Sequence, residues 1–255
     1  MSEHQQVLAV DIGGTKTAVG YVAQGALHTL DRFPTPEDPQ AAVDRLAELV
    51  ADAPETITGI GIGAPGPLDQ ERGLFLTPPN LQSWWNFPFV DRLREATQLP
   101  AILENDANVG ALGEAIFGNG QAYRSIYYLT VSTGIGGGFI LDGTVHRGHA
   151  GMAGEVWAFE PGNFFGHHRG DTILELCSGP GLLRRTRAGI RGGEETRLCE
   201  EELDTATLLR ADAEGDPLAH RIMEEARDAL AGLINMITTT LAPDCVVLAG
   251  GLCTE

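Results

Sequence analysis

The segment VLAVDIGGTKTAVGYV, residues 7–22, sets polar and glycine residues between two apolar runs. The second run is short and rich in β-branched residues, so we expect a strand there and not a helix. A P-loop or a dinucleotide-binding turn requires a helix directly after its glycines, and DIGGTK is therefore neither motif. The segment predicts a β-hairpin, with strands over 7–12 and 17–23 joined by a glycine turn.

The residues of this turn suit an anion. Backbone N–H groups at Gly13 and Gly14 can converge on a phosphate. Thr15 adds a hydroxyl donor and Lys16 adds positive charge, while Asp11 ends the strand and is placed to hold Mg²⁺ through water. A plain hairpin turn explains the glycines but not this set of polar side chains. We interpret the turn as a tight hairpin that also binds phosphate.

A second segment, TVSTGIGGGFI, again sets hydroxyls beside glycines after an apolar strand, with Thr133 and Gly134 at its turn. A third glycine turn, Gly250–Gly251, ends another strand. Strand, glycine turn and strand thus occur twice, over 7–23 and 125–141, which suggests two related halves that could face each other across a cleft. Such turns are what a nucleotide polyphosphate and its base would require.

The segment LENDAN, residues 103–108, ends a strand and begins a helix. Asp106 falls near the helix N-terminus, with Asn105 just before it. Asp106 would accept the proton of a hydroxyl nucleophile while Asn105 holds a neighbouring hydroxyl. Because Asp is a common N-cap residue, the alternative that Asp106 only caps the helix stays open.

Two further polar residues lie in constrained loops and could bind a polyol. Glu155 is flanked by glycine in GMAGEVW, and Asn80 follows a proline pair in TPPNLQSW. A solvated glutamate is the simpler alternative for Glu155. Trp84 and Trp85 could stack on a sugar face, although adjacent tryptophans are more often packed in a core.

Composition excludes several function classes. The chain has 255 residues and a formal net charge of −18, with only 17 Lys and Arg, which argues against a nucleic-acid surface. Its polar N-terminus and the lack of an apolar run of membrane-spanning length predict no signal peptide and no membrane span. We therefore expect a cytoplasmic protein whose partners are small molecules.

Cysteine and histidine placement argues against a structural metal. The four cysteines are widely spaced and form no C-x-x-C pair, so we expect reduced thiols. His167 and His168 are adjacent, and His146 and His149 lie nearby. Without paired cysteines or suitably spaced carboxylates, solvated loop histidines are favoured over a metal site.

Mixed strands and helices predict an α/β fold. The expected helices cover 39–52, 87–97, 107–117, 179–188 and 216–241. The remaining expected strands cover 27–33, the start of 57–69, 100–106, 125–131, 137–141 and 245–251, and 146–176 is expected to be loop. We place an N-terminal α/β domain at 1–115 and a C-terminal α/β domain at 116–255.

The ordered motifs resemble the ROK family of sugar kinases (repressor, open reading frame, kinase). They are DIGGTKTAVGYV, GIGAPGPLD, TPPNLQSW, LENDANVGALGE, STGIGGGFILDGTVHRGHAGMAGE and VVLAGG. The resemblance implies an actin-like ATPase (ribonuclease H-like) fold, in which two α/β domains surround a cleft for ATP and sugar. It implies transfer of the γ-phosphoryl group of ATP to a hexose hydroxyl, usually that on C6. Glucose is the first expectation, followed by fructose, mannose and an N-acetylated amino sugar.

The resemblance also implies residue roles. Asp106 would be the general base, Asp11 would hold Mg²⁺ through water, and Asn80, Asn105 and Glu155 would contact the sugar. ATP would be bound by Gly13, Gly14, Thr15, Lys16, Thr133, Gly134, Gly250 and Gly251. A homodimer is compatible with the resemblance. A non-catalytic sugar-binding or regulatory member is the alternative. The repressor role is disfavoured because no helix-turn-helix segment precedes the first strand.

This sequence departs from the family pattern at two places. Many members follow the motif glutamate with a Gly-His pair and a cysteine cluster that holds zinc, but here Val156, Trp157 and Ala158 follow, so no structural zinc is expected. A family glutamate that contacts sugar falls on Leu174, with Glu175 one position away. The chain also stops just after the adenosine glycines, where relatives continue, so we expect either a short member or a truncated sequence.

Overall fold

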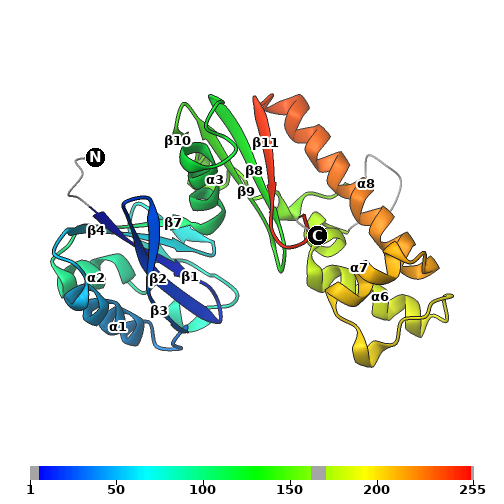
Figure 1. The fold of residues 1–255 in the computed structure, drawn as a ribbon, viewed down its shortest axis with the longest axis horizontal. Coiled ribbons are helices and arrows are strands. Elements are labelled where there is room, and N and C mark those ends of the chain that lie inside the picture. Colours follow the sequence, from blue (N-terminus) through cyan, green and yellow to red (C-terminus); the bar gives the residue numbers. More distant parts are fainter. Residues whose placement is uncertain (1–5, 162–170, 254–255) are drawn as a thin grey trace. The chain divides into compact units, whose positions relative to one another are not determined.

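The computed structural model describes residues 6–161 and 171–253, which fold as two compact units (Figure 1). Unit 1 extends to Val109 and takes in Gly148–Gly151, and unit 2 comprises Gly110–Arg147 and the chain from Met152 onward. Helix α3 (Asp106–Phe117) contributes its first turn to unit 1 and its remainder to unit 2. The domains expected from sequence divide at 115/116, further along the same helix.

Unit 1 is built on a five-stranded sheet with the order β3-β2-β1-β4-β7. Its strands are β1 (Gln6–Ile12), β2 (Lys16–Ala23), β3 (Ala26–Pro34), β4 (Ile57–Ala64) and β7 (Ala101–Asn105). The predicted hairpin is present, since β1 and β2 pair antiparallel with Ile12 opposite Thr17. Because β4 and β7 run parallel to β1, the carboxyl ends of these three strands share one edge of the sheet.

Two helices cover one face of this sheet. Within unit 1, α1 (Pro39–Asp52) and α2 (Phe89–Thr97) lie side by side (Figure 1). The buried residues of α1, which include Val43 and Leu46, recur at helical spacing and join the strand side chains in one core. A short hairpin of β5 (Leu68–Asp69) and β6 (Leu74–Phe75) lies between β4 and α2 in the chain.

The two tryptophans of the TPPNLQSW loop have different environments. Trp84 is fully buried and packs on Phe75 and Phe89, with ring centroids 5.0 and 5.2 Å away. Its indole N–H donates to the carbonyl of Pro36 at 3.0 Å. Trp84 is therefore a core residue of unit 1, whereas Trp85 is 44% exposed.

Unit 2 contains a four-stranded sheet with the order β10-β9-β8-β11. Its strands are β8 (Ser125–Val131), β9 (Ile135–Leu141), β10 (Thr144–Val145) and β11 (Cys245–Ala249). An antiparallel hairpin, β8 and β9, lies beside a strand, β11, that runs parallel to β8. The four strands β3-β2-β1-β4 of unit 1 have the same arrangement, so the internal similarity seen in the sequence corresponds to a repeated topology.

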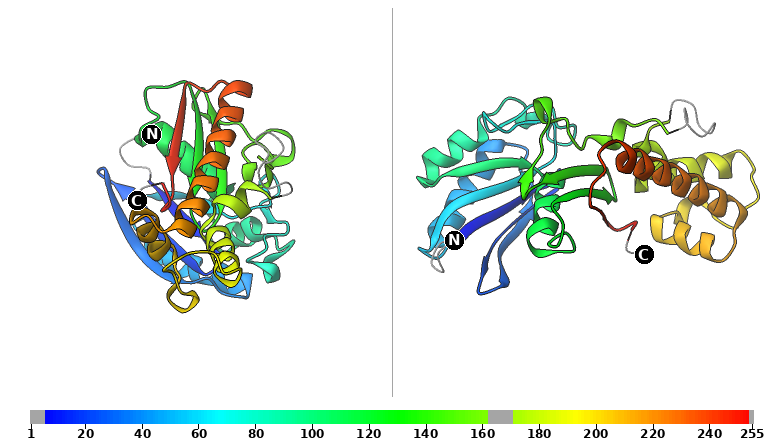
Figure 2. Two further views of the ribbon diagram at one scale, coloured as in Figure 1. Left: turned by 90° about the vertical axis from the view of Figure 1, so that its right-hand side faces the viewer. Right: turned by 90° about the horizontal axis from the view of Figure 1, so that it is seen from above.

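Helices cover both faces of the second sheet. Alternation along β8 directs Ile126 toward the cluster that includes Ala111 of α3, while Tyr127 and Leu129 join the cluster on the opposite face. That larger cluster is formed with α5 (Ile173–Cys177), α6 (Gly179–Arg191), α7 (Thr205–Ala213) and α8 (Pro217–Thr240). The long helix α8 runs beside the sheet (Figure 2).

Two helices depart from the sequence expectations. The segment 146–176 was expected to be loop, but α5 begins inside it, where Thr172 and Glu175 form a capping box. Helix α7 was not expected because its sequence buries only Leu208 and Ala211, which is too few for a clear helical period. Among the described residues, no helix combines the length and apolar character needed to cross a bilayer.

Candidate active site

The carboxyl edge of the unit 1 sheet brings together several predicted site residues. Asp11 on β1 lies opposite Gly63 on β4, which in turn lies opposite Glu104 on β7. Asp11 and Glu104 are thus two strand spacings apart, about 10 Å. A Cβ at Gly63 would lie 3.5 Å from the Val109 side chain, an ordinary van der Waals distance, so the first turn of α3 packs directly on β4.

The capping of α3 answers the question left open for Asp106. The Asn105 side-chain oxygen accepts from the N–H groups of Ala107 at 2.9 Å and Asn108 at 3.3 Å, as an N-cap residue does. Asp106 is the first residue of the helix, and its exposed carboxylate shares the Ala107 N–H at 2.8 Å. Asn105 and not Asp106 is therefore the N-cap residue of α3, and the positive end of the helix dipole favours the negative charge of Asp106.

Sequence reasoning missed Glu104, which holds the first turn of α3 through hydrogen bonds. Its side chain is 8% exposed, and Oε1 accepts from the Asn105 N–H at 2.9 Å and from the Asn108 amide at 3.0 Å. The Gln70 amide donates to the same oxygen at 3.4 Å. Glu104 thus ties the end of β7 to the first turn of α3. A carboxylate directly after the consecutive apolar residues 101–103 of the strand was the available signal.

The first glycine turn is held closed by a threonine that the sequence did not indicate. The Gly13 N–H donates to the Lys16 carbonyl at 2.9 Å. Thr35, just after β3, donates its hydroxyl to the Gly13 carbonyl at 2.7 Å and its N–H to the Thr15 carbonyl at 3.1 Å. With both carbonyls occupied, the exposed side chains of Thr15 and Lys16 project from a fixed turn.

Asp11 stands at the start of this turn. Its side chain reaches the surface, but the surrounding protein desolvates the carboxylate enough to raise its pKa. A cation beside Asp11 would offset that desolvation. Because Mg²⁺ keeps several waters and uses one or two carboxylates together with phosphate oxygens, a single carboxylate here fits such an ion.

Asn80 packs directly on the turn. A Cβ at Gly14 would come 2.6 Å from the Asn80 Cβ, so only glycine allows this approach. Gly14, Thr35 and Asn80 line a pocket of about 420 Å³ within unit 1, with the Trp84 loop completing its wall. The structure therefore brings Asn80 together with the predicted phosphate turn.

Unit 2 gathers its own predicted nucleotide residues at one edge of its sheet. The Ser132 N–H donates to the Gly134 carbonyl at 2.9 Å and forms the second turn, where Thr133 is exposed. Gly250 has φ +93°, and a Cβ there would come 2.3 Å from the Val131 carbonyl oxygen. The turn Gly250–Gly251 is thus packed against the strand that leads into the second turn.

Helix α6 also reaches this turn. The N–H of Gly179, its first residue, donates to the Ser132 carbonyl at 2.8 Å, and Ser178 caps the helix. The SGPGL segment therefore holds the Ser132 carbonyl of the second glycine turn, a role that residue types alone did not reveal.

The loop that carries Glu155 crosses β9 at a glycine pair. Gly154 has φ +93°, and a Cβ there would come 2.3 Å from the Gly137 carbonyl oxygen. A Cβ at Gly137 would come 2.6 Å from the Gly154 oxygen and 2.7 Å from the Tyr127 hydroxyl. The glycines of GIGGG and of AGE are therefore required together, because two backbones touch there. One oxygen of Glu155, Oε2, accepts from the Trp157 indole N–H at 2.7 Å.

Glu175, Leu174 and Cys177, from the segment in which no structural zinc is expected, are engaged in other contacts. Glu175 caps α5 through Thr172, so its carboxylate is engaged in the helix start, and Leu174 packs against the core. Cys177 is buried, and desolvation raises the pKa of its thiol to about 12. Such a thiol is a poor metal ligand.

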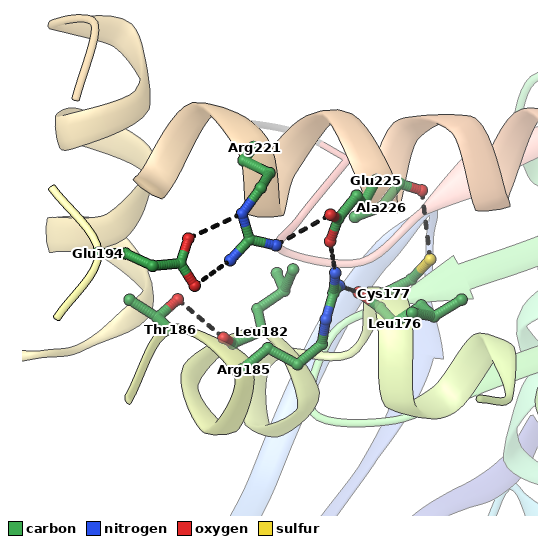
Figure 3. Close-up of polar contacts among 9 residues, drawn as sticks. All are labelled: Leu176, Cys177, Leu182, Arg185, Thr186, Glu194, Arg221, Glu225 and Ala226. Carbon is green, nitrogen blue, oxygen red and sulfur yellow. Dashed lines mark hydrogen bonds and ion pairs between the residues drawn. The ribbon is translucent and has the colours of Figure 1, made fainter. Parts of the chain in front are cut away.

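Polar contacts around Cys177 join three helices (Figure 3). The Cys177 thiol contacts the Ala226 carbonyl at 3.3 Å, and Arg185 donates to the Leu176 carbonyl at 3.2 Å. Arg185 also pairs with Glu225, which accepts from Arg221 at 2.9 Å. Over 6–161 and 171–253, no group of three metal-binding side chains is present. His167 and His168 lie outside the described residues.

Comparisons with known proteins match this arrangement. A hexokinase from Thermus thermophilus is 36% identical with a TM-score of 0.81, covering 98% of this chain and 83% of its own. A Streptomyces griseus glucokinase solved with glucose and AMPPNP is 30% identical with a TM-score of 0.74, covering 97% and 83%. An N-acetylmannosamine kinase from Shigella boydii is 32% identical, covering 96% and 82%.

The solved ROK kinases have the actin-like ATPase fold, and the similarity over nearly the whole chain gives this protein the same fold. The ROK family model matches residues 7–255, which include both glycine hairpins, the start of α3 and the loop of Glu155. The chain belongs to the ROK family.

Proposed function

We propose that the protein transfers the γ-phosphoryl group of ATP to a hydroxyl of a hexose, with the C6 hydroxyl of glucose as the first candidate. The sugar-kinase class is supported by the hexokinase, glucokinase and N-acetylmannosamine kinase relatives. ATP is supported by the glucokinase complex with AMPPNP. Because these relatives act on different sugars, fructose, mannose and N-acetylated amino sugars follow glucose in the order of candidates.

The proposal depends on one observation at the start of α3, where Asn105 and Asp106 have different roles. Asn105 caps the helix, and Asp106 presents an exposed carboxylate at its first position. Asp106 would accept the proton of the sugar hydroxyl as its oxygen attacks the γ-phosphorus, and ADP would leave with the bridging oxygen. The N–H groups of the Asn105 side-chain amide, which the cap does not use, would hold a neighbouring hydroxyl.

The glycine turns would supply electrostatic stabilisation. The Gly13 N–H is engaged with the Lys16 carbonyl and keeps the first turn closed, so the backbone N–H groups of Gly14 and Gly134 would be the ones to bind phosphate oxygens. Thr15, Lys16 and Thr133 would add side-chain donors, and Gly250–Gly251 would bind the adenosine. Asp11 would hold Mg²⁺ through water, and the bound ion would neutralise charge on the transferring group.

A coupled assay of ADP release tests the proposal. Mg–ATP is offered with a panel of hexoses and acetamido-hexoses, and we expect turnover that depends on one sugar. Slow release of ADP without sugar is expected as the baseline. Turnover equal with and without sugar would contradict the proposal. Sugar binding by calorimetry without turnover on any member would favour a regulatory protein instead.

A further inference from the structure

Trp157 occupies a place in unit 2 that the proposed reaction does not yet use. It lies two residues after Glu155, in a short turn between Val156 and Phe159, whose side chains pack against the core. The Phe159 N–H donates to the Val156 carbonyl at 3.0 Å, and the Ile173 N–H donates to the Phe159 carbonyl at 2.8 Å. With both neighbours anchored, Trp157 is held at the surface, 42% exposed.

The indole of Trp157 engages one carboxylate oxygen of Glu155. Its Nε1–H donates to Oε2 at 2.7 Å, which is short for an N–H donor and typical of a charged acceptor. Among the described residues, Oε1 makes no hydrogen bond. A carboxylate held at one oxygen loses its rotation and presents the other oxygen in one direction.

The base of the loop is equally constrained. Gly154 and Gly137 are in backbone contact, and the Tyr127 hydroxyl lies against Gly137. Tyr127 is 1% exposed, and its hydroxyl has no hydrogen-bond partner in the described structure. Desolvation, and then the charge of Glu155, raise the pKa of Tyr127 above its usual range, so the hydroxyl stays protonated. The backbone before Glu155 is thus fixed by the packing of Gly154 on Gly137, and the Glu155 side chain is fixed by its hydrogen bond with Trp157.

We propose that Trp157 is a positioning residue for sugar binding: its indole N–H fixes Oε2 of Glu155 so that Oε1 accepts hydroxyls of the hexose. This inference rests on the proposed function, because it assigns Glu155 to the sugar. The half-exposed indole also lies close enough to Glu155 to sense a bound sugar.

Two substitutions separate the hydrogen bond from the ring. Trp157→Phe keeps an aromatic side chain and removes the donor, and Trp157→His restores an N–H. Loss of one hydrogen bond to a charged group predicts a rise of at least about tenfold in the sugar KM for Trp157→Phe. The kcat and the ATP KM are expected to stay within about twofold, since Trp157 acts through Glu155 and not on the reacting atoms. Trp157→His is expected to recover most of the sugar KM.

Glu155→Gln provides the matching background. If Trp157 acts through the Glu155 carboxylate, Trp157→Phe should have a much smaller effect on sugar affinity there than in the wild type. Equal effects in both backgrounds would overturn the proposal, as would an unchanged sugar KM in Trp157→Phe. Thermal unfolding of each variant identifies a general loss of folding, and a sugar KM that follows stability and not the N–H donor would also overturn it.

Tryptophan fluorescence measured without ATP keeps this test apart from the proposed reaction. Glucose or the best sugar of the panel should change the emission of wild type and of Trp85→Phe, which removes the other half-exposed indole. The change should be lost in Trp157→Phe. A signal that disappears with Trp85 and persists without Trp157 contradicts the inference alone. Wild-type protein that neither binds nor phosphorylates any sugar contradicts the proposed function.

Discussion

Gly137→Ala is the substitution for which the structure gives the clearest expectation. The new Cβ would lie 2.6 Å from the Gly154 carbonyl oxygen and 2.7 Å from the Tyr127 hydroxyl oxygen. Carbon atoms need about 3.5 Å or more from such neighbours, and two of the obstacles are backbone or a buried ring. The sheet and the Glu155 loop must therefore separate.

The cost follows from overpacking. An added methyl in a closed core destabilises by about 1–3 kcal/mol. For a protein of this size, each kcal/mol lowers Tm by about 2–4 °C, so we expect a fall of about 2–12 °C. Because the displaced loop carries Glu155, the sugar KM should rise while the ATP KM stays close to that of wild type.

Gly134→Ala is the matched control in the same hairpin. A Cβ at Gly134 would meet nothing within 4 Å, and its φ is not positive, so its stability should change by less than about 0.5 kcal/mol. If its backbone approaches phosphate, the ATP KM should rise instead of the sugar KM. Thermal unfolding and steady-state kinetics measure both variants. Equal Tm values for Gly137→Ala and wild type, or the same kinetic change in both variants, would refute the reasoning.

Three further substitutions test other parts of the structure. Thr35→Val removes the hydroxyl that donates to the Gly13 carbonyl and should raise the ATP KM about fivefold, corresponding to about 1 kcal/mol, whereas Thr35→Ser should not. Glu104→Gln keeps the shape of a buried acceptor but removes its charge. We expect kcat to fall about tenfold and the pH dependence of kcat to shift. An unchanged pH dependence of kcat would leave Glu104 without a positioning role. Hydrogen bonds from the backbone and hydroxyl of Ser125 lower the pKa of Asp244, so the folded protein binds fewer protons at this carboxylate than the unfolded chain does. The resulting contribution to folding stability is present above about pH 3.8 and is lost as the pH falls below that value. Urea unfolding across this range should show a smaller acid loss for Asp244→Asn than for wild type, and identical losses would contradict the assignment.

Much of the fold could be predicted because the signal is local. The alternation in 7–23 and 125–141 specifies the hairpins directly, and the long period of α8 predicts a helix over 216–241 that the structure has at Pro217–Thr240. The short helices α5 and α7 were missed because caps and tertiary contacts start them, and these leave a weak periodic signal.

The site was predicted in its residue types but not in its connections. The sequence showed Asn105 and Asp106 side by side, yet only the backbone hydrogen bonds show which of them caps α3. Thr35 and Glu104 act through partners that the fold brings close, and no local pattern marks such contacts. The Glu155 loop needs Gly137 because the backbone of Gly154 touches it, although Gly137 lies 17 positions before Gly154 in the chain.

The measurement that tests the central claim most directly is the turnover of Asp106→Asn with the best sugar of the panel, together with calorimetric titration of that sugar. The account predicts that sugar binding survives while kcat falls by about 10²–10⁴, because the exposed carboxylate at the first position of α3 no longer accepts the hydroxyl proton. Full turnover by Asp106→Asn would contradict it.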